Sequence, residues 1–220
     1  MNYDPYQPPR TDAPAHRPTA TANGFVVSPV GLAASVLLGI AVGSKVIEIV
    51  AWLTLEPRMY ASVGSVVDGV GILARVAGII TFLVWIRRIV KNVHSLGISG
   101  LQHTPGGAVG GWFVPLRNLV HGYRVVLEVW RASDPANAGA APHAWLAHDK
   151  EDGDAGIILH WWLACITSRI AVVATRFETT FSFWIVSACA EVIAFGLMVI
   201  VIRRVDLRQR EFARRLEPLA

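Results

Sequence analysis

GGAVGGWFVPLRNLVHGYRVVLEVWR, residues Gly106–Arg131, is the stretch whose placement decides the fold of this chain. It is one of five apolar stretches, and the one least suited to crossing a membrane. The other four reach the length of about 20 mostly apolar helical residues that a bilayer core about 30 Å thick requires. They are Pro29–Leu55, Ser62–Ile89, Gly156–Ala174 and Ser182–Ile202. The chain is therefore predicted to be an all-α integral membrane protein.

The composition of the 220-residue chain agrees with this class. Hydrophobic residues make up 53% of it and charged residues only 16%, whereas a soluble domain has about 25% charged residues. The apolar runs are continuous rather than alternating, which indicates helices rather than the strands of a barrel. The net charge of +4 comes from basic residues beside the apolar runs. That distribution is typical of membrane topology and anionic lipid rather than of nucleic acid.

Basic residues indicate which ends of the spans face the cytoplasm, because Lys and Arg accumulate in short cytoplasmic loops. One basic cluster follows the second span (Arg87, Arg88, Lys91) and another follows the last span (Arg203, Arg204). If the quoted stretch crossed the membrane, the two clusters would lie on opposite sides. If it does not cross, both are cytoplasmic. We therefore predict four transmembrane helices in two hairpins, with both termini in the cytoplasm and anionic lipid headgroups bound at both clusters.

A polar stripe runs along the quoted stretch. Its residues recur at intervals of four, three and four, which puts them on one helical face; they are Arg117, His121, Arg124 and Glu128. A helix over residues 115–131 is about 25 Å long, short for a span, and each arginine at the bilayer centre would cost about 2.5–3.5 kcal/mol. We therefore predict an amphipathic helix in the plane of the cytoplasmic membrane surface, with the stripe in water. A re-entrant segment, or a fifth span with the stripe facing the bundle, stays open.

The remaining segments complete the domain organisation. Residues 1–27 are polar and rich in proline, so they cannot bury enough apolar surface to fold and are predicted to be disordered. The membrane domain is expected over residues 28–203 and includes a solvated cytoplasmic loop over 132–155. A basic helical tail is predicted over residues 204–220.

Two narrow strips predict helix contacts. The first lies in the basic tail and suits lipid headgroups or a cytoplasmic partner, or else a solvated helix end; it consists of Val205, Phe212 and Leu216. The second is a strip of small residues on the first span, which permits close approach of another helix; it consists of Ser35, Gly39 and Gly43. We expect the second strip to face the other helix of its own hairpin, and dimerisation is the alternative.

Six charged residues fall inside the predicted spans, three of each sign: Lys45, Glu48, Asp68, Arg75, Arg169 and Glu191. Counting back from the turn of each hairpin places Lys45 about level with Asp68, and Arg169 about level with Glu191. Arg75 lies near the same mid-depth as Glu191, so we expect Arg75, Arg169 and Glu191 to form one network. Charges in a bilayer are costly. They mark a path for ions, protons or substrates, pair with one another, or stand alone and reach toward the membrane surface. We favour pairs that fasten the hairpins together.

A family resemblance is densest around the quoted stretch. The residues that carry it are Trp85-Ile86-Arg87-Arg88, Asn92, Leu96-Gly97, Thr104-Pro105-Gly106, Trp112-Phe113-Val114-Pro115, Asn118-Leu119, Tyr123, Glu128-Val129-Trp130-Arg131-Ala132-Ser133, Trp161-Trp162 and Ser168-Arg169. This run, from about Val27 to Arg203, resembles the bacterial membrane family called domain of unknown function 4328. It departs from the family at Gly122, where we expect proline. The resemblance implies a membrane location and supplies no catalytic residue.

The candidate working surface is the polar stripe together with the loop that leads into it. That loop holds the family-like residues Pro105, Gly106, Trp112, Phe113, Pro115 and Asn118. No zinc-protease helix, Walker loop, nucleophile elbow or Cys-x-x-Cys motif occurs in the chain. The histidines and acidic residues of the 132–155 loop lack the spacing of a calcium or zinc site.

We therefore expect no cofactor, no metal and no enzymatic activity. The favoured function is a scaffold or regulatory protein of the bacterial cytoplasmic membrane, with a second copy or another protein as partner. The alternative is an oligomeric channel or small transporter that uses the six charged residues.

Overall fold

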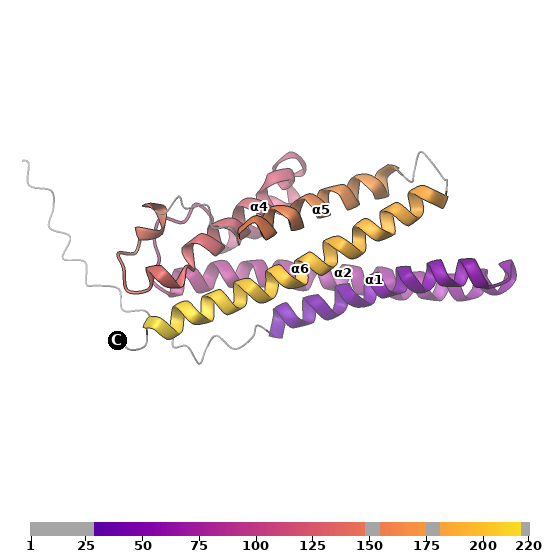
Figure 1. Ribbon diagram of the computed structural model, residues 1–220, viewed down its shortest axis with the longest axis horizontal. Helices are drawn as coiled ribbons and strands as arrows, with labels where there is room; N and C mark the ends of the chain where they lie inside the picture. The colour runs from indigo at the N-terminus through magenta and orange to yellow at the C-terminus, as the bar shows by residue number, and fades with distance from the viewer. Residues whose placement is uncertain (1–28, 148–154, 175–180, 217–220) are drawn as a thin grey trace, which may run out of the picture.

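The computed structural model describes residues 29–147, 155–174 and 181–216, and every regular element within these ranges is helical (Figure 1). The α-helices are α1 (Pro29–Thr54), α2 (Pro57–Ser95), α3 (Pro105–Gly110), α4 (Pro115–Ala132), α5 (Gly156–Ala174) and α6 (Phe181–Leu216). Short 3-10 turns are η2 (Gly111–Phe113), η3 (Pro135–Asn137) and η4 (Ala144–Ala147). The tail predicted to be disordered, residues 1–27, lies outside the described residues.

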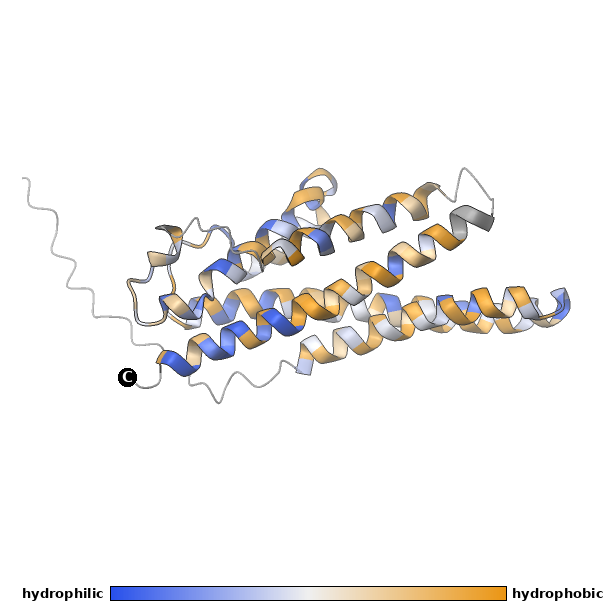
Figure 2. Ribbon diagram, in the orientation of Figure 1, coloured by the Kyte–Doolittle hydropathy of each residue, from blue (hydrophilic) through white to orange (hydrophobic). Residues whose placement is uncertain are grey.

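Four of these helices are long and apolar enough to cross a membrane: α1, α2, α5 and the segment Ile185–Leu216 of α6. Their outward faces carry large exposed apolar side chains such as Val66, Leu73 and Ile170. Apolar colour covers most of α1, α5 and the first part of α6 in Figure 2, and polar colour gathers at the C-terminal end of α6. An apolar surface of this extent suits lipid rather than water.

Helix α1 lies along α2, and α5 lies along α6 (Figure 1). Two glycines of α2 let α1 approach closely. A Cβ atom at Gly78 would lie 2.6 Å from Cγ of Leu38, and one at Gly71 would overlap the hydroxyl of Ser44. The expectation that Gly39 and Gly43 face the other helix of their own hairpin was wrong. Gly39 faces the Phe195 ring of α6, and nothing lies near Gly43, because the hairpin uses the glycines of α2 instead.

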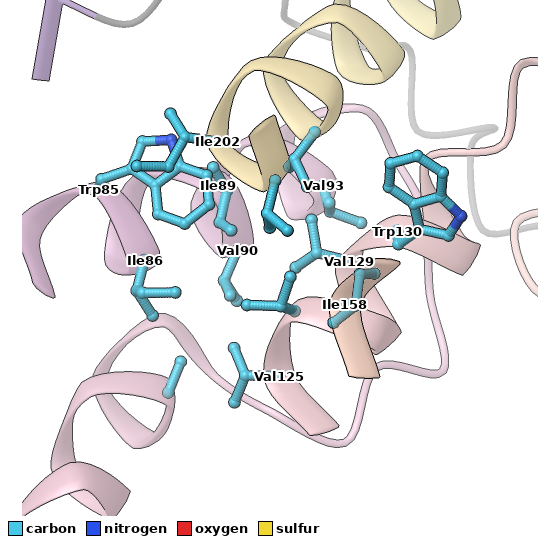
Figure 3. Packing of buried hydrophobic residues seen from close by; sticks show 14 of the residues in the cluster. Trp85, Ile86, Ile89, Val90, Val93, Val125, Val129, Trp130, Ile158 and Ile202 are labelled. Atoms are coloured by element: carbon cyan, nitrogen blue, oxygen red, sulfur yellow. The ribbon is translucent and has the colours of Figure 1, made fainter. Parts of the chain in front are cut away.

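The buried core sits at one end of the bundle, where the second half of α2 meets α4, the start of α5 and the second half of α6 (Figure 3). Trp85, Ile89, Val129 and Ile158 are almost fully buried there. The tail beyond Ile202 is part of this core, since α6 runs unbroken to Leu216. Both interpretations of the apolar strip in the tail were therefore wrong, because Val205 and Phe212 are only 1% and 3% exposed and pack inside the protein.

Buried polar contacts fix α6 against its neighbours. The Gln209 side-chain amide donates to the carbonyl of Ile89 at 2.9 Å and accepts from the Asn92 amide at 3.0 Å. The Trp85 indole N–H donates to Asp206 at 3.0 Å. A buried amide that satisfies both its donor and its acceptor specifies one register of packing. These bonds explain why α2 continues to Ser95, beyond the predicted end at Ile89.

Candidate functional site

Helix α4 begins at Pro115, one residue after an extended Val114, as proline at the first helical position favours. Its apolar side does not face lipid along its whole length. Val125 and Val126 are fully buried in the core. The predicted water-facing stripe was wrong for two of its four residues, because His121 and Glu128 are also buried. The loop between α2 and α4 folds over them, and periodicity alone could not reveal this cover.

Glu128 holds that loop in place. Its carboxylate accepts a hydrogen bond from the backbone N–H of Gln102 and lies 2.5 Å from Nδ1 of His103. The side chains of His103 and Glu128 are only 10% and 8% exposed. A carboxylate this enclosed needs such donors, since an unpaired buried charge is strongly unfavourable. His103 was absent from the residues singled out in the sequence, and no motif marks it as the partner of Glu128.

His121 is the second buried polar group on α4. Its Nε2 lies 2.9 Å from the carbonyl oxygen of Ala108, and its ring packs edge-on to His103 and directly against Gly111. Burial lowers the pKa of His121, which outweighs the opposing effect of the carbonyl. The neutral ring is therefore favoured, with its N–H donating to Ala108. Gly111 is required at this contact because a Cβ there would overlap the imidazole.

The three arginines of α4 remain exposed: Arg117, Arg124 and Arg131. A spacing of seven residues keeps them on one side of the helix. Arg124 and Arg131 line a cavity of about 470 Å³ together with His103, Glu128 and Trp145. Arg117 and Arg124 line a smaller cavity of about 170 Å³. The two cavities share His103 and Arg124, and together they form a groove along α4. Within the described ranges none of the three arginines forms an ion pair, so this groove presents net positive charge.

The family-like loop forms a compact cover at the start of α4. Thr104 caps α3 by accepting from the Gly107 N–H at 3.0 Å, with Pro105 in the first turn and Gly106 exposed. Trp112 packs edge-on against Trp162 of α5 at 5.6 Å between ring centroids. Asn118 is half-buried near the start of α4.

An apolar knob projects beside this cover, and it consists of Phe113, Val114, Leu116, Leu119 and Val120. Phe113 is 73% exposed and Leu116 is 82% exposed. The Trp162 indole N–H donates to the carbonyl of Leu119 at 2.8 Å, which ties the knob to α5.

The charged residues of α1 and α2 form a group of three. The Lys45 ammonium lies 2.6 Å from Glu48 and 3.5 Å from Asp68. The predicted Lys45–Asp68 pair is therefore present. It joins the two helices of the hairpin, and Glu48, one turn along α1, completes the group.

The other three charges gather between the two helix pairs. Arg75 of α2 lies 2.8 Å from Glu191 of α6. The predicted Arg169–Glu191 pair was wrong, because Glu191 points to α2 rather than to its own hairpin partner. Arg169 of α5 instead lies 6.0 Å from the centroid of the Trp162 ring. All three residues line one cavity of about 420 Å³, but the expected network of three is not formed, because Arg169 pairs with neither of the other two.

The described part of the chain holds no group of three or more His, Cys, Asp or Glu residues able to bind a metal ion. His148 and the acidic residues that follow it, up to Asp154, lie outside the described residues. Of the residues weighed for metal binding, His143 and His160 are described, and both are exposed.

Comparison with known proteins places this arrangement in a family. The model of the family described as domain of unknown function (DUF4328) matches residues 59–210, which includes α4, its cover and most of α2, α5 and α6. Neither a curated protein nor a solved structure matches the chain.

Proposed function

Because the chain belongs to the DUF4328 family, whose activity is unassigned, we propose that it is a non-enzymatic scaffold or regulatory protein of the bacterial cytoplasmic membrane. The observation that carries the proposal is the burial pattern. The most densely buried part of the protein is the end that holds α4, and it presents an exposed groove of three arginines beside an apolar knob. A rigid end with a shaped charged surface suits binding to a partner or a membrane surface.

The two-hairpin topology, with both termini in the cytoplasm, is part of the proposal. The Gln209–Ile89 hydrogen bond holds the C-terminal half of α6 beside α2. The basic cluster after the second span and the cluster after the last span therefore lie at the same end of the bundle. This supports one cytoplasmic face with anionic lipid at both clusters.

The position of the knob supports an interfacial location for the start of α4. Trp162, which binds the Leu119 carbonyl, lies six residues into α5, about 9 Å from its first residue. Interfacial helices sink apolar side chains about 5–10 Å into the membrane boundary. We therefore propose that the knob enters lipid, while Arg124 and Arg131 stay in water, so that only part of α4 lies in the membrane surface.

A cysteine at Ala136 tests the topology. Ala136 is exposed in η3. In a variant in which the two native cysteines, Cys165 and Cys189, are serine, Ala136→Cys is expected to react with a membrane-impermeant maleimide only after the membrane is opened. Arg58→Cys, at the exposed turn between α1 and α2, is the control that reacts in intact cells. Reaction of Ala136→Cys from outside would overturn the two-hairpin topology.

The alternative function, an oligomeric channel or small transporter, is favoured by one observation. The cavity of about 420 Å³ between the helix pairs is lined by Arg75, Arg169 and Glu191. Against it stands the direct pairing of Arg75 with Glu191, and of Lys45 with Glu48 and Asp68, because paired charges fasten helices rather than line a path.

Flux measurements separate these two functions. The purified protein in liposomes is expected to carry no proton or ion flux above protein-free liposomes. Arg75→Gln and Glu191→Gln are expected only to lower stability, by about 0.6–1.7 kcal/mol for an interhelical polar contact in a membrane. Arg203→Gln, at the basic cytoplasmic end, is the control with unchanged stability. Flux in the wild type that both charge variants abolish, at unchanged melting temperature, would establish transport instead.

A further inference from the structure

A cleft opens between the two helix pairs, and its walls are mostly apolar. Its outer part is the cavity of about 420 Å³, lined by side chains such as Leu38, Ile79 and Val172. Its inner part is a cavity of about 160 Å³ against three tryptophans, Trp112, Trp161 and Trp162. Both cavities are lined by Arg169, so they adjoin along one face of α5. The larger volume lies in the range of about 300–1,000 Å³ usual for small-molecule sites.

Arg169 is the charge without a counterpart in this cleft. Arg75 and Glu191 neutralise each other at 2.8 Å. Arg169 is exposed, and it forms no ion pair within the described residues. Its guanidinium lies over the Trp162 ring, 6.0 Å from the centroid, which is a weak cation–π contact. The three charged groups of the cleft therefore carry a net positive charge. A lone cation inside a transmembrane segment is costly and marks a site that an anion completes.

Two tryptophans at the inner end of the cleft present no accessible polar atom to it. The indole N–H groups of Trp112 and Trp161 are buried and have no hydrogen-bond partner among the described residues. Trp161 is 1% exposed and Trp112 is half-buried. The rest of this end is aromatic and apolar, so it suits an apolar chain with few polar atoms.

The direction of the cleft follows from α5. Arg169 lies five residues before Ala174, the last described residue of that helix, about 8 Å from its end. Trp162 lies seven residues in the other direction, about 10 Å deeper. The charged end of the cleft is therefore nearer the membrane surface opposite α4, and the aromatic end lies farther from that surface, toward the side that holds α4.

We infer that this cleft binds a membrane lipid with an anionic headgroup, whose phosphate pairs with Arg169 and whose acyl chain extends toward Trp161 and Trp162. Charge complementarity selects an anionic rather than a zwitterionic lipid. The order of groups along α5, charge near the surface and aromatic rings deeper, matches the order of groups along a lipid. A second copy of the chain is the competing occupant, and the experiment distinguishes it from a lipid.

Quenching of tryptophan fluorescence by brominated lipid tests the inference, because the reporters already line the cleft. The full-length protein is placed in phosphatidylcholine bilayers that contain the same small fraction of phosphatidylglycerol. Bromine is carried on the acyl chains of either the phosphatidylglycerol or an equal amount of phosphatidylcholine. The brominated anionic lipid is expected to quench the wild type at least about twofold more. Arg169→Gln should make the two lipids quench equally, and Arg169→Lys should keep part of the excess.

Two further variants identify the site. Trp161→Phe should reduce the excess quenching, because it removes a reporter at the inner end of the cleft. Arg58→Gln, which changes an exposed arginine outside the cleft, should leave the excess unchanged. Equal quenching by both lipids in the wild type, or an excess that survives Arg169→Gln, overturns the inference. So does an excess that Arg58→Gln removes equally, which would indicate a general effect of exposed basic residues.

The size of the particle, measured by light scattering, is followed in parallel. If Arg169→Gln separates a dimer and leaves lipid quenching unchanged, the occupant is a second copy and the inference fails. Circular dichroism and the melting temperature establish that each variant is folded. If Arg169→Gln does not fold, the quenching measured for Arg169→Lys decides whether Arg169 binds the lipid.

Discussion

Replacing Glu128 with alanine is expected to destabilise the protein by about 1–3 kcal/mol, the usual loss when the partner of an enclosed hydrogen-bonding group is removed. The carboxylate accepts a hydrogen bond from the Gln102 N–H and lies 2.5 Å from Nδ1 of His103, and the His103 and Glu128 side chains are enclosed between the loop and α4. Its removal takes the acceptor away from the Gln102 N–H and from the His103 side chain at once. Chemical unfolding in detergent, followed by near-UV circular dichroism, measures the free energy of unfolding.

Three further variants show whether the loss of stability comes from the contacts of Glu128. Arg124→Ala, an exposed neighbour on α4, should change the free energy by no more than about 0.5 kcal/mol. Glu128→Gln keeps an acceptor without the charge and should fall between alanine and the wild type. His103→Ala combined with Glu128→Ala should add little beyond Glu128→Ala alone, because the two residues act as one unit. If Glu128→Ala had the same free energy of unfolding as the wild type, the loop would be held by its apolar contacts instead.

The sequence predicts the helices of this protein better than it predicts their partners. The four candidate spans follow from length and apolarity, which are local properties of a segment. Pro115 and the apolar periodicity after it correctly locate the start of α4. The Lys45–Asp68 pair could also be predicted, since one short turn fixes the register of a hairpin. Each of these results needs only residues that are close along the chain.

The errors all concern contacts between segments that are distant along the chain. Periodicity shows that His121 and Glu128 share a face with Arg124, but not that the loop around His103 covers them. Glu191 pairs with Arg75 because two hairpins pack against each other, and no count within one hairpin could reveal that. The tail strip with Phe212 resembles a surface strip, yet the core of α2 and α4 covers it. The roles of these residues in function stay predictions.

Gly122→Leu is expected to destabilise the protein by about 3 kcal/mol, near the upper end of the usual cost of overpacking. A Cβ atom at Gly122 would lie 2.5 Å from Cζ3 of Trp162 and 2.8 Å from Cη2 of Trp112. Neither ring can move away freely. Trp162 is fixed by its hydrogen bond to Leu119, and Trp112 is held edge-on between Trp162 and Phe82. The better helix propensity of leucine, worth about 1 kcal/mol over glycine, does not offset a clash with two rings.

This variant also tests whether the knob depends on α5. Displaced tryptophan rings should break the Trp162–Leu119 bond, so the knob should lose its fixed depth and protease should cleave near Phe113 more rapidly. Gly106→Leu, in α3, is the matched control, because nothing lies within 4 Å of a Cβ atom there. Unfolding free energy, tryptophan emission and cleavage rate should all stay near wild type in the control. A Gly122→Leu protein with wild-type values in all three would show that α4 and α5 can separate without loss, and that Gly122 is not needed for their close approach.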